Sequence, residues 1–126
     1  MKQERKKKIK QVFAVMNLKT NGQIINLNIC SMGTLDASMV NPREVFKSSI
    51  LSNAASFIAI HNHPSGSLQP SQEDRDVTRR LLECGDFLNI KMLDHIIVAR
   101  ESAHVYSFRE HGELDMLKSK HRDWER

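Results

Sequence analysis

The sequence contains no apolar stretch long enough to cross a membrane, and it has only two cysteines. Its longest uninterrupted apolar runs, such as residues 12–16, fall far short of the roughly 18 residues that a membrane-spanning helix needs. Cys30 and Cys84 match no zinc-ribbon or CxxC spacing, and two cysteines cannot form the disulfide framework of a small secreted protein. The sequence therefore excludes a membrane-spanning helix and a disulfide-dependent fold, and we expect both thiols to be reduced.

The N-terminus also lacks the features of a secretory signal. Residues 1–10 carry six basic side chains and one acidic side chain, but neither an apolar segment nor a small-residue cleavage site follows them. We therefore expect a cytoplasmic protein. With 126 residues, of which 40% are apolar and 27% charged, the chain fits one ordinary globular domain.

Positive charge is concentrated at the N-terminus. The net charge is +5 over residues 1–10 and −1 over residues 11–126. A basic arm on a nearly neutral body is weak support for nucleic-acid binding, because such an arm can equally be a solvated tail or part of a linker. We divide the chain into a basic arm at 1–10, a folded domain at 11–110, and a charged C-terminal helix or tail at 111–126.

Hydrophobic patterns and turn residues predict alternating strands and helices. We expect strands over 11–18, 23–30, 54–60, 90–99 and 105–108, and helices over 42–52 and 71–85. The first two strands flank an Asn-Gly turn and should form a hairpin. Asn41 and Pro42 suit a helix start, and Gly85 is placed to end the second helix. Two prolines, a glycine and two serines predict a loop over 61–70, directly after a buried strand.

One segment carries residues suited to metal chemistry. His61-Asn62-His63 is followed, after seven residues, by Ser71-Gln72-Glu73-Asp74. Two imidazoles and one carboxylate form a common catalytic zinc set, because three protein ligands leave the fourth tetrahedral position for water. His61 and His63 alone would be weak evidence, and Ser71 with Asp74 can also be only a helix capping box. The strand, loop and helix start around them make the combination more specific.

The whole motif resembles the JAMM, or MPN+, metalloprotease-like domains, whose signature is His-x-His, seven residues, Ser-x-x-Asp. Residues 41–46 (NPREVF), 61–66 (HNHPSG) and 93–98 (LDHIIV) resemble the RadC-like branch of that family. The resemblance spans 12–110. It implies a single JAMM/MPN-like, cytidine deaminase-like domain of α/β (α+β) class, with a curved, mostly antiparallel sheet flanked by helices. Larger RadC proteins carry an N-terminal helix-hairpin-helix region, and we expect this chain to lack it.

The resemblance also implies a mechanism and a role for each motif residue. The implied ligands of one Zn²⁺ ion are His61, His63 and Asp74. A metal-bound water would attack an amide or isopeptide carbonyl, and Ser71 would stabilise the oxyanion. Glu44 matches the general base of the family, and Glu73 is the local alternative. Iron, manganese and nickel suit the same ligands and stay open as alternatives.

Other classes of function also stay open. The RadC-like resemblance favours, as the alternative to a hydrolase, a DNA-repair or recombination accessory protein that binds nucleic acid through the basic arm. A structural zinc module would need a fourth ligand, from Cys30 or His95. Asp94 and His95 either orient a ligand imidazole or are only polar residues of a strand. The expected partners are a peptide, isopeptide or other amide substrate, and a second copy of the chain in a homodimer.

Overall fold

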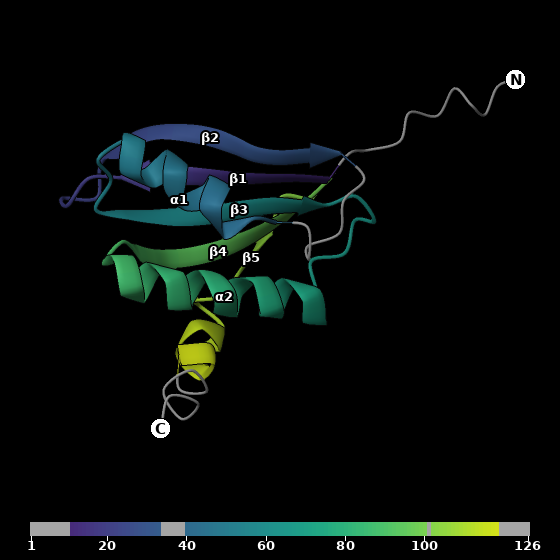
Figure 1. Cartoon of the computed structure of the whole chain (residues 1–126). Helices are drawn as coiled ribbons and strands as arrows, with labels where there is room; N and C mark the ends of the chain where they lie inside the picture. The colour runs from purple at the N-terminus through teal and green to yellow at the C-terminus, as the bar shows by residue number, and fades with distance from the viewer. Residues whose placement is uncertain (1–10, 34–39, 101, 119–126) are drawn as a thin grey trace, which may run out of the picture.

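The computed structural model describes residues 11–33, 40–100 and 102–118. In chain order the elements are β1 (Gln11–Leu18), β2 (Ile24–Gly33), α1 (Pro42–Leu51), β3 (Ser56–His63), α2 (Gln72–Leu88), β4 (Lys91–Ala99) and β5 (Val105–Ser107). The strands form one sheet in the order β2-β1-β3-β4-β5 (Figure 1). Only the β3–β4 pair is parallel among these neighbours. The predicted α/β class and the mostly antiparallel sheet are therefore confirmed.

β1 and β2 form the predicted hairpin. The turn between them is longer than two residues, because the Lys19 N–H donates to the carbonyl oxygen of Gln23 at 2.8 Å. Gly22 has a φ of +89°, a conformation that side chains with a Cβ rarely adopt. The second strand continues to Gly33, beyond the predicted end at residue 30. Residues 34–39 lie outside the part of the chain that the structure describes.

α1 begins as the sequence predicts and packs over β1 and β3. The Asn41 side chain accepts a hydrogen bond from the Arg43 N–H, and Pro42 occupies the first turn. The Phe46 ring meets the Phe57 ring edge-on, with centroids 5.3 Å apart. α1 and α2 both contribute to the core on this face of the sheet, whose main members are Phe13, Val15, Val45, Phe46, Phe57, Ala59, Val77, Leu81 and Ile97.

The prediction that a loop begins at His61 is wrong, because β3 continues to His63. The pairing of β3 with β4 extends to His63 opposite Ala99. On the other side, the Val12 N–H donates to the Asn62 side chain at 2.6 Å. Pairing with β1 at His61 and with β4 as far as His63 therefore keeps the two histidines in extended backbone, and the turn begins only at Pro64.

The prediction that Gly85 ends the second helix is also wrong. α2 continues to Leu88, and Asn89 takes the left-handed position after it, with a φ of +60°. Gly85 serves a different purpose, because a Cβ at this position would lie 2.5 Å from the carbonyl oxygen of Ile90. A glycine is thus needed for close approach of the chain that leaves the helix.

A short helix at 113–118 follows β5. Leu114 and Leu117 on it are 4% and 2% exposed and join the core. The segment therefore packs on the body of the domain, which fits a C-terminal helix better than a tail over these residues. Residues 119–126, which include Trp124, lie outside the described part.

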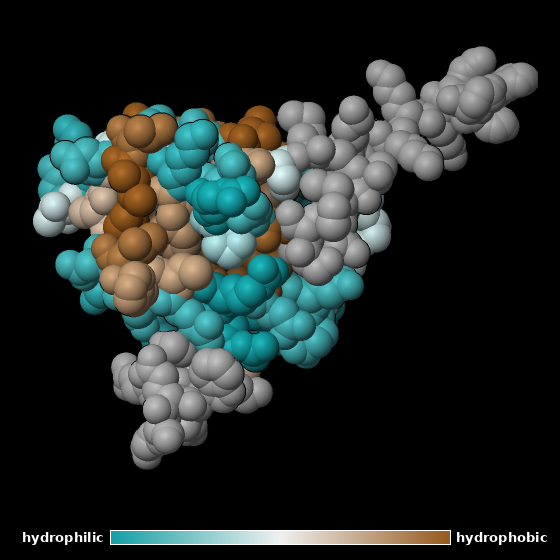
Figure 2. Space-filling model, viewed as in Figure 1, coloured by the Kyte–Doolittle hydropathy of each residue, from teal (hydrophilic) through white to brown (hydrophobic). Residues whose placement is uncertain are grey.

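Exposed large apolar side chains of the described residues include a group on β2 and a group on the two long helices, besides Val105 and Met116 elsewhere. Leu27 and Ile29 of β2 pair with Met16 and Ala14, on the face of the sheet away from α1. Figure 2 shows a second apolar area over α1 and the nearby end of α2. The exposed large apolar residues of these two helices are Ile50, Leu51, Phe87 and Leu88. None of the helices over 11–33, 40–100 and 102–118 has the length and apolar character to cross a membrane.

Candidate metal centre

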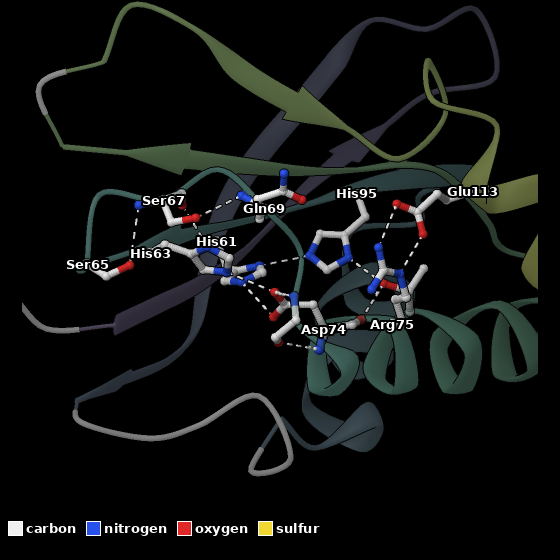
Figure 3. Close-up of polar contacts among 11 residues, drawn as sticks. His61, His63, Ser65, Ser67, Gln69, Asp74, Arg75, His95 and Glu113 are labelled. Carbon is white, nitrogen blue, oxygen red and sulfur yellow. Dashed lines mark hydrogen bonds and ion pairs between the residues drawn. The ribbon is translucent and has the colours of Figure 1, made fainter.

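The two histidines and Asp74 meet where the end of β3 faces the start of α2 (Figure 3). Side chains two residues apart in a strand point to the same face, so His61 and His63 both point toward the helices. The loop at 64–71 returns the chain, and Asp74 lies in the first turn of α2. One ligand atom from each of the three residues lies within 4.8 Å of the other two. The structure thus brings the predicted ligands together.

The carboxylate of Asp74 lies between the two imidazoles. Its Oδ1 is 3.0 Å from His61 Nε2, and its Oδ2 is 2.8 Å from His63 Nε2. Asp74 is 1% exposed and His61 is 3% exposed. Burial by itself raises the pKa of Asp74, but contacts with His61, the Ser71 N–H and the nearby His63 outweigh burial and hold that pKa well below its ordinary value. Asp74 is therefore a carboxylate at neutral pH, which is the form that binds a metal ion.

A capping box holds Asp74 in place. The Ser71 N–H donates to Asp74 Oδ2 at 2.8 Å, and the Asp74 N–H donates to Ser71 Oγ at 3.0 Å. The capping-box interpretation and the metal-ligand interpretation therefore do not compete. The same carboxylate oxygen that faces His63 is oriented by the start of the helix.

The backbone of the loop orients His63. His63 Nδ1 is 2.9 Å from the carbonyl oxygen of Ser67, and since a carbonyl only accepts, Nδ1 must carry the hydrogen. Nε2 lies 2.8 Å from Asp74 Oδ2, a contact in which the carboxylate can only accept. A metal ion bound by both atoms would take the place of the hydrogen that this contact otherwise requires. The loop is held by turns of its own, because Ser65 Oγ accepts from the Ser67 N–H and Gly66 has a φ of +92°. Ser65 has a turn role in these contacts.

His61 contacts a second buried histidine. His61 Nδ1 is 2.8 Å from His95 Nε2, and His95 Nδ1 is 2.6 Å from Thr78 Oγ1. His95 is fully buried, and its ring stacks on Phe108 with centroids 4.7 Å apart. Burial, together with the nearby His61, lowers the pKa of His95 to about 3. The ring is therefore neutral at physiological pH, and it contacts Nδ1 of His61, whereas Asp74 faces Nε2 of the same ring (Figure 3).

One polar atom of the site lacks a hydrogen-bond partner. His61 Nε2 is buried and makes no hydrogen bond within the described residues, although Asp74 Oδ1 lies 3.0 Å away. The carboxylate oxygen is thus near this nitrogen but off the direction of an N–H bond. Buried polar atoms without partners are rare in folded proteins. A cation between the two imidazoles and the carboxylate would satisfy this nitrogen, so the group is able to hold a metal ion.

Neither candidate for a fourth ligand joins the group. Both ring nitrogens of His95 are engaged by His61 and Thr78. Burial, and to a smaller extent the charge of Glu44, raises the pKa of the Cys30 thiol to about 11, which disfavours the thiolate that binds metals. Among the described residues the group therefore offers three protein ligands, as in catalytic rather than structural zinc sites.

The two predicted acid–base candidates lie outside the group of three. Glu44 is exposed in the first turn of α1 and close enough to Cys30 to affect its pKa. Cys30 is the bulge residue of β2 beside Phe13, and Phe13 pairs with His61. Glu44 is thus at the same end of the sheet as the histidines, with one strand between. Glu73 is exposed beside Asp74.

Sequence reasoning missed some neighbours of the site. Thr78 lies four residues after Asp74 on α2, which places it on the same side of the helix, and this spacing was visible in the sequence. Gln11, the first residue of β1, lies two residues before Phe13, which pairs with His61. The contact between His63 and the Ser67 carbonyl had no sequence signal, because it depends on the path of the loop.

Asp94 and His95, which are neighbours within β4, have separate contacts. His95 reaches His61, as one of the two interpretations predicted. Asp94 instead accepts from the Ser107 hydroxyl at 2.6 Å and from the Arg109 N–H at 3.0 Å. Asp94 therefore holds β5 and the turn after it, whereas His95 belongs to the surroundings of the metal-ligand group.

Comparison with known proteins agrees with this geometry. The sequence model of the RadC-like JAB domain matches residues 1–113. A UPF0758 protein of Rubrobacter xylanophilus is 47% identical over 102 residues, which are 81% of this chain and 44% of that protein. One of Thermotoga maritima is 43% identical over 105 residues, 83% of this chain and 46% of that protein. UPF0758 protein YsxA of Bacillus subtilis is 45% identical over 102 residues, 81% and 43% of the two chains. This chain thus spans less than half the length of these relatives, and it belongs to the RadC-like JAB domain family.

Proposed function

We propose that this chain is a zinc-dependent hydrolase of JAMM type that cleaves an amide or isopeptide bond. The observation that carries the proposal is the buried, partnerless Nε2 of His61 facing the Asp74 carboxylate. His63 presents its own Nε2 to the other oxygen of the same carboxylate. A zinc ion on two imidazoles and one carboxylate supplies an open coordination position and lowers the pKa of water there to about 7.

The protein groups around the ligands support the remaining roles. The Ser71 hydroxyl oxygen accepts from the Asp74 N–H, while its hydrogen has no acceptor in the contacts of the described residues. This hydrogen is therefore free to be donated to the oxyanion that develops on an attacked carbonyl. Ser71 is also exposed at the start of α2, so a substrate can reach it.

We assign the proton-accepting role to Glu44. It is solvent-exposed and lies at the histidine end of the sheet. Glu73 precedes Asp74 by one position on α2, and the side chains of neighbouring helix residues point about 100° apart. Because the Asp74 side chain points at the histidines, the Glu73 side chain is directed away from them. Removing a general base lowers turnover by roughly 10²–10⁴-fold.

The first test measures metal content in untagged protein by mass spectrometry. We expect about one zinc per chain, with loss of zinc in His63→Ala and in Asp74→Ala. His104→Ala is the matched control, because the His104 side chain is exposed and only its backbone makes the described contacts. Absence of bound metal, together with no uptake from added zinc, would reject the hydrolase proposal.

The second test separates the two glutamates in a screen of peptide and isopeptide substrates. Glu44→Gln should retain zinc and lose activity by roughly 10²–10⁴-fold, whereas Glu73→Gln should stay within a few-fold of the wild type. The reverse pattern would move the general base to Glu73. Loss of zinc in Glu44→Gln would mean that this residue supports the site and does not act on a proton.

The nucleic-acid alternative has no support in the described residues, since the basic arm at 1–10 lies outside them. Binding to nucleic acid and a cytoplasmic location stay predictions from the sequence. A steep fall of affinity with salt, lost on deletion of residues 2–10, would be the signature of binding through the arm.

A further inference from the structure

The contacts behind His61 form a closed path through three elements. Asp74 of α2 contributes its backbone carbonyl, Thr78 stands one turn later on the same helix, and His95 of β4 links Thr78 to His61 of β3. Asp74 then faces His61 again through its side chain. Every hydrogen bond in this path has a direction, and the direction decides which nitrogen of His61 carries the hydrogen.

The direction can be assigned from the threonine. Thr78 Oγ1 lies 2.7 Å from the carbonyl oxygen of Asp74. A carbonyl cannot donate, so the Thr78 hydroxyl must supply the only hydrogen between these two oxygens. Its single hydrogen is then used, and toward His95 the threonine oxygen can only accept. His95 Nδ1, at 2.6 Å from Thr78 Oγ1, therefore carries a hydrogen.

The same logic continues to His61. His95 is fully buried, and its two ring nitrogens contact a hydroxyl and an imidazole but no carboxylate. A charged ring there would be a buried cation without a partner, which is strongly unfavourable. With its hydrogen on Nδ1, the neutral ring accepts at Nε2. His61 Nδ1 must then donate across the 2.8 Å contact, and Nε2 of His61 keeps its lone pair.

We propose that Thr78 and His95 are positioning residues that fix His61 in the tautomer able to bind a metal ion through Nε2. The reverse direction would leave two oxygens 2.7 Å apart with no hydrogen between them. It would also place a hydrogen on His61 Nε2, where a metal ion could not bind. The absence of a hydrogen-bond partner at His61 Nε2 fits the first arrangement.

Aromatic rings keep the two imidazoles in this orientation. Phe13 stacks on His61 with centroids 5.9 Å apart and an interplanar angle of 21°. Phe108 stacks on His95 with an interplanar angle of 8°. Rotation of either imidazole about its Cβ–Cγ bond would break these hydrogen bonds, and the stacked aromatic rings oppose that rotation. Thr78 thus affects the metal site without contacting any ligand imidazole or the metal.

The inference rests on the proposed metal site, but its first readout needs no metal. In chelator-treated protein with all 126 residues, ¹⁵N NMR of the histidine rings distinguishes a protonated from an unprotonated Nε2. We expect His61 of the wild type to be protonated at Nδ1 only. A protonated His61 Nε2 in the neutral ring would overturn the inference, and this result requires no variant.

Substitution of Thr78 gives the second readout. Thr78→Val keeps the shape and removes the hydroxyl, so His95 Nδ1 loses its acceptor and the preference for one His61 tautomer falls. We expect zinc affinity, measured by competition with a chromophoric chelator, to drop about 10–100-fold, the usual range for partners that orient metal ligands. Thr78→Ser retains the hydroxyl and should stay close to the wild type.

Outcomes for the inference and for the proposed function can be told apart. Equal tautomer populations and equal zinc affinity in wild type and Thr78→Val would reject the role of Thr78. If Thr78→Val does not fold, His95→Gln against His95→Met decides, because only the glutamine amide can accept from His61 and donate to Thr78. The expected tautomer without any zinc uptake would uphold the inference and reject the proposed hydrolase.

Discussion

Tyr106, Glu113 and Arg75 form a polar cluster that ties α2 to the segment after β5. Arg75 Nε donates to Glu113 Oε1 at 2.7 Å, and the Tyr106 hydroxyl donates to Glu113 Oε2. The hydrogen bond from Arg75 lowers the pKa of Glu113 below its ordinary value, although burial opposes this effect. The stability that Glu113 contributes is therefore present above the ordinary glutamate pKa and is lost as the pH falls through its lower native pKa.

Tyr106 should titrate at unusually high pH. Burial, followed by the hydrogen bond to Glu113 and its negative charge, raises the pKa of Tyr106 to about 12. The native state thus favours the neutral phenol, so its stabilising contribution is present below about pH 10 and is lost as the pH rises toward 12. Since the chain has one tyrosine, tyrosinate absorbance reports this group alone.

We expect Glu113→Gln to lower the midpoint of the Tyr106 titration toward pH 10. The midpoint should stay above 10, because Tyr106 remains partly buried. Asp115→Asn, which removes an exposed carboxylate two residues after Glu113 in the chain, should leave the midpoint unchanged, because Asp115 is not among the groups that shift the pKa of Tyr106. Circular dichroism at each pH shows whether the fold persists. A wild-type midpoint near 10 in the folded protein would contradict the assigned environment of Tyr106.

At the residue scale, the sequence predicted the ligand types and their spacing but not their orientation. His61, His63 and Asp74 were identifiable because each is fixed by a local element. The tautomers were not, since they depend on Ser67 and on the contacts of His95 with Thr78, and these form only when the loop, α2 and β4 pack together. Which nitrogen faces the carboxylate is thus a tertiary property.

At the element scale, Gly85 illustrates a glycine that serves packing inside a helix. In a helix interior, Gly→Ala normally stabilises by up to about 1 kcal/mol. Here the added Cβ would lie 2.5 Å from the backbone oxygen of Ile90. The backbone at Ile90 cannot move aside as a flexible side chain would. The overpacking cost of about 1–3 kcal/mol should therefore exceed the gain in helix propensity from alanine.

We therefore expect Gly85→Ala to lower the free energy of unfolding by about 1–2 kcal/mol, measured by urea denaturation. Phe87→Ala on the same helix is the control, because Phe87 is 89% exposed, and it should change stability by less than about 0.5 kcal/mol. An increase in stability for Gly85→Ala would show that Gly85 only interrupts the helix.

The boundaries of elements were harder to predict than their existence. The sequence placed α1, α2 and all five strands of the described residues, and it left the segment after β5 open between a helix and a tail. It ended β3 before His61, since proline and glycine nearby indicated a loop, and the pairing with β1 and β4 that extends the strand is invisible locally. It ended α2 at Gly85 because glycine often follows the last helical residue, whereas here Asn89 takes that position and Gly85 makes room for the backbone of Ile90.

At the scale of the whole molecule, the candidate metal centre connects the sheet to α2. β3 supplies two residues of the group that could hold a metal ion, α2 supplies the third, and His95 of β4 contacts one of them. The resemblance predicted this general architecture. The homodimer stays a prediction, and sedimentation velocity of the wild type at several concentrations is its direct measurement.

A metal ion held by β3 and α2 should stabilise the entire domain, because the unfolded chain does not hold the three ligands together. Binding to the native state alone contributes about 4 kcal/mol when free zinc exceeds Kd by a thousandfold. For a domain of this size, that corresponds to a rise in Tm of about 10 °C or more. We expect this rise on adding zinc to chelator-treated wild type and to His104→Ala, and its absence in Asp74→Ala. Differential scanning calorimetry measures the shift. An unchanged Tm in the wild type would mean that the group at the end of β3 holds no zinc in the native state, whereas an equal rise in Asp74→Ala would place the ion elsewhere on the chain.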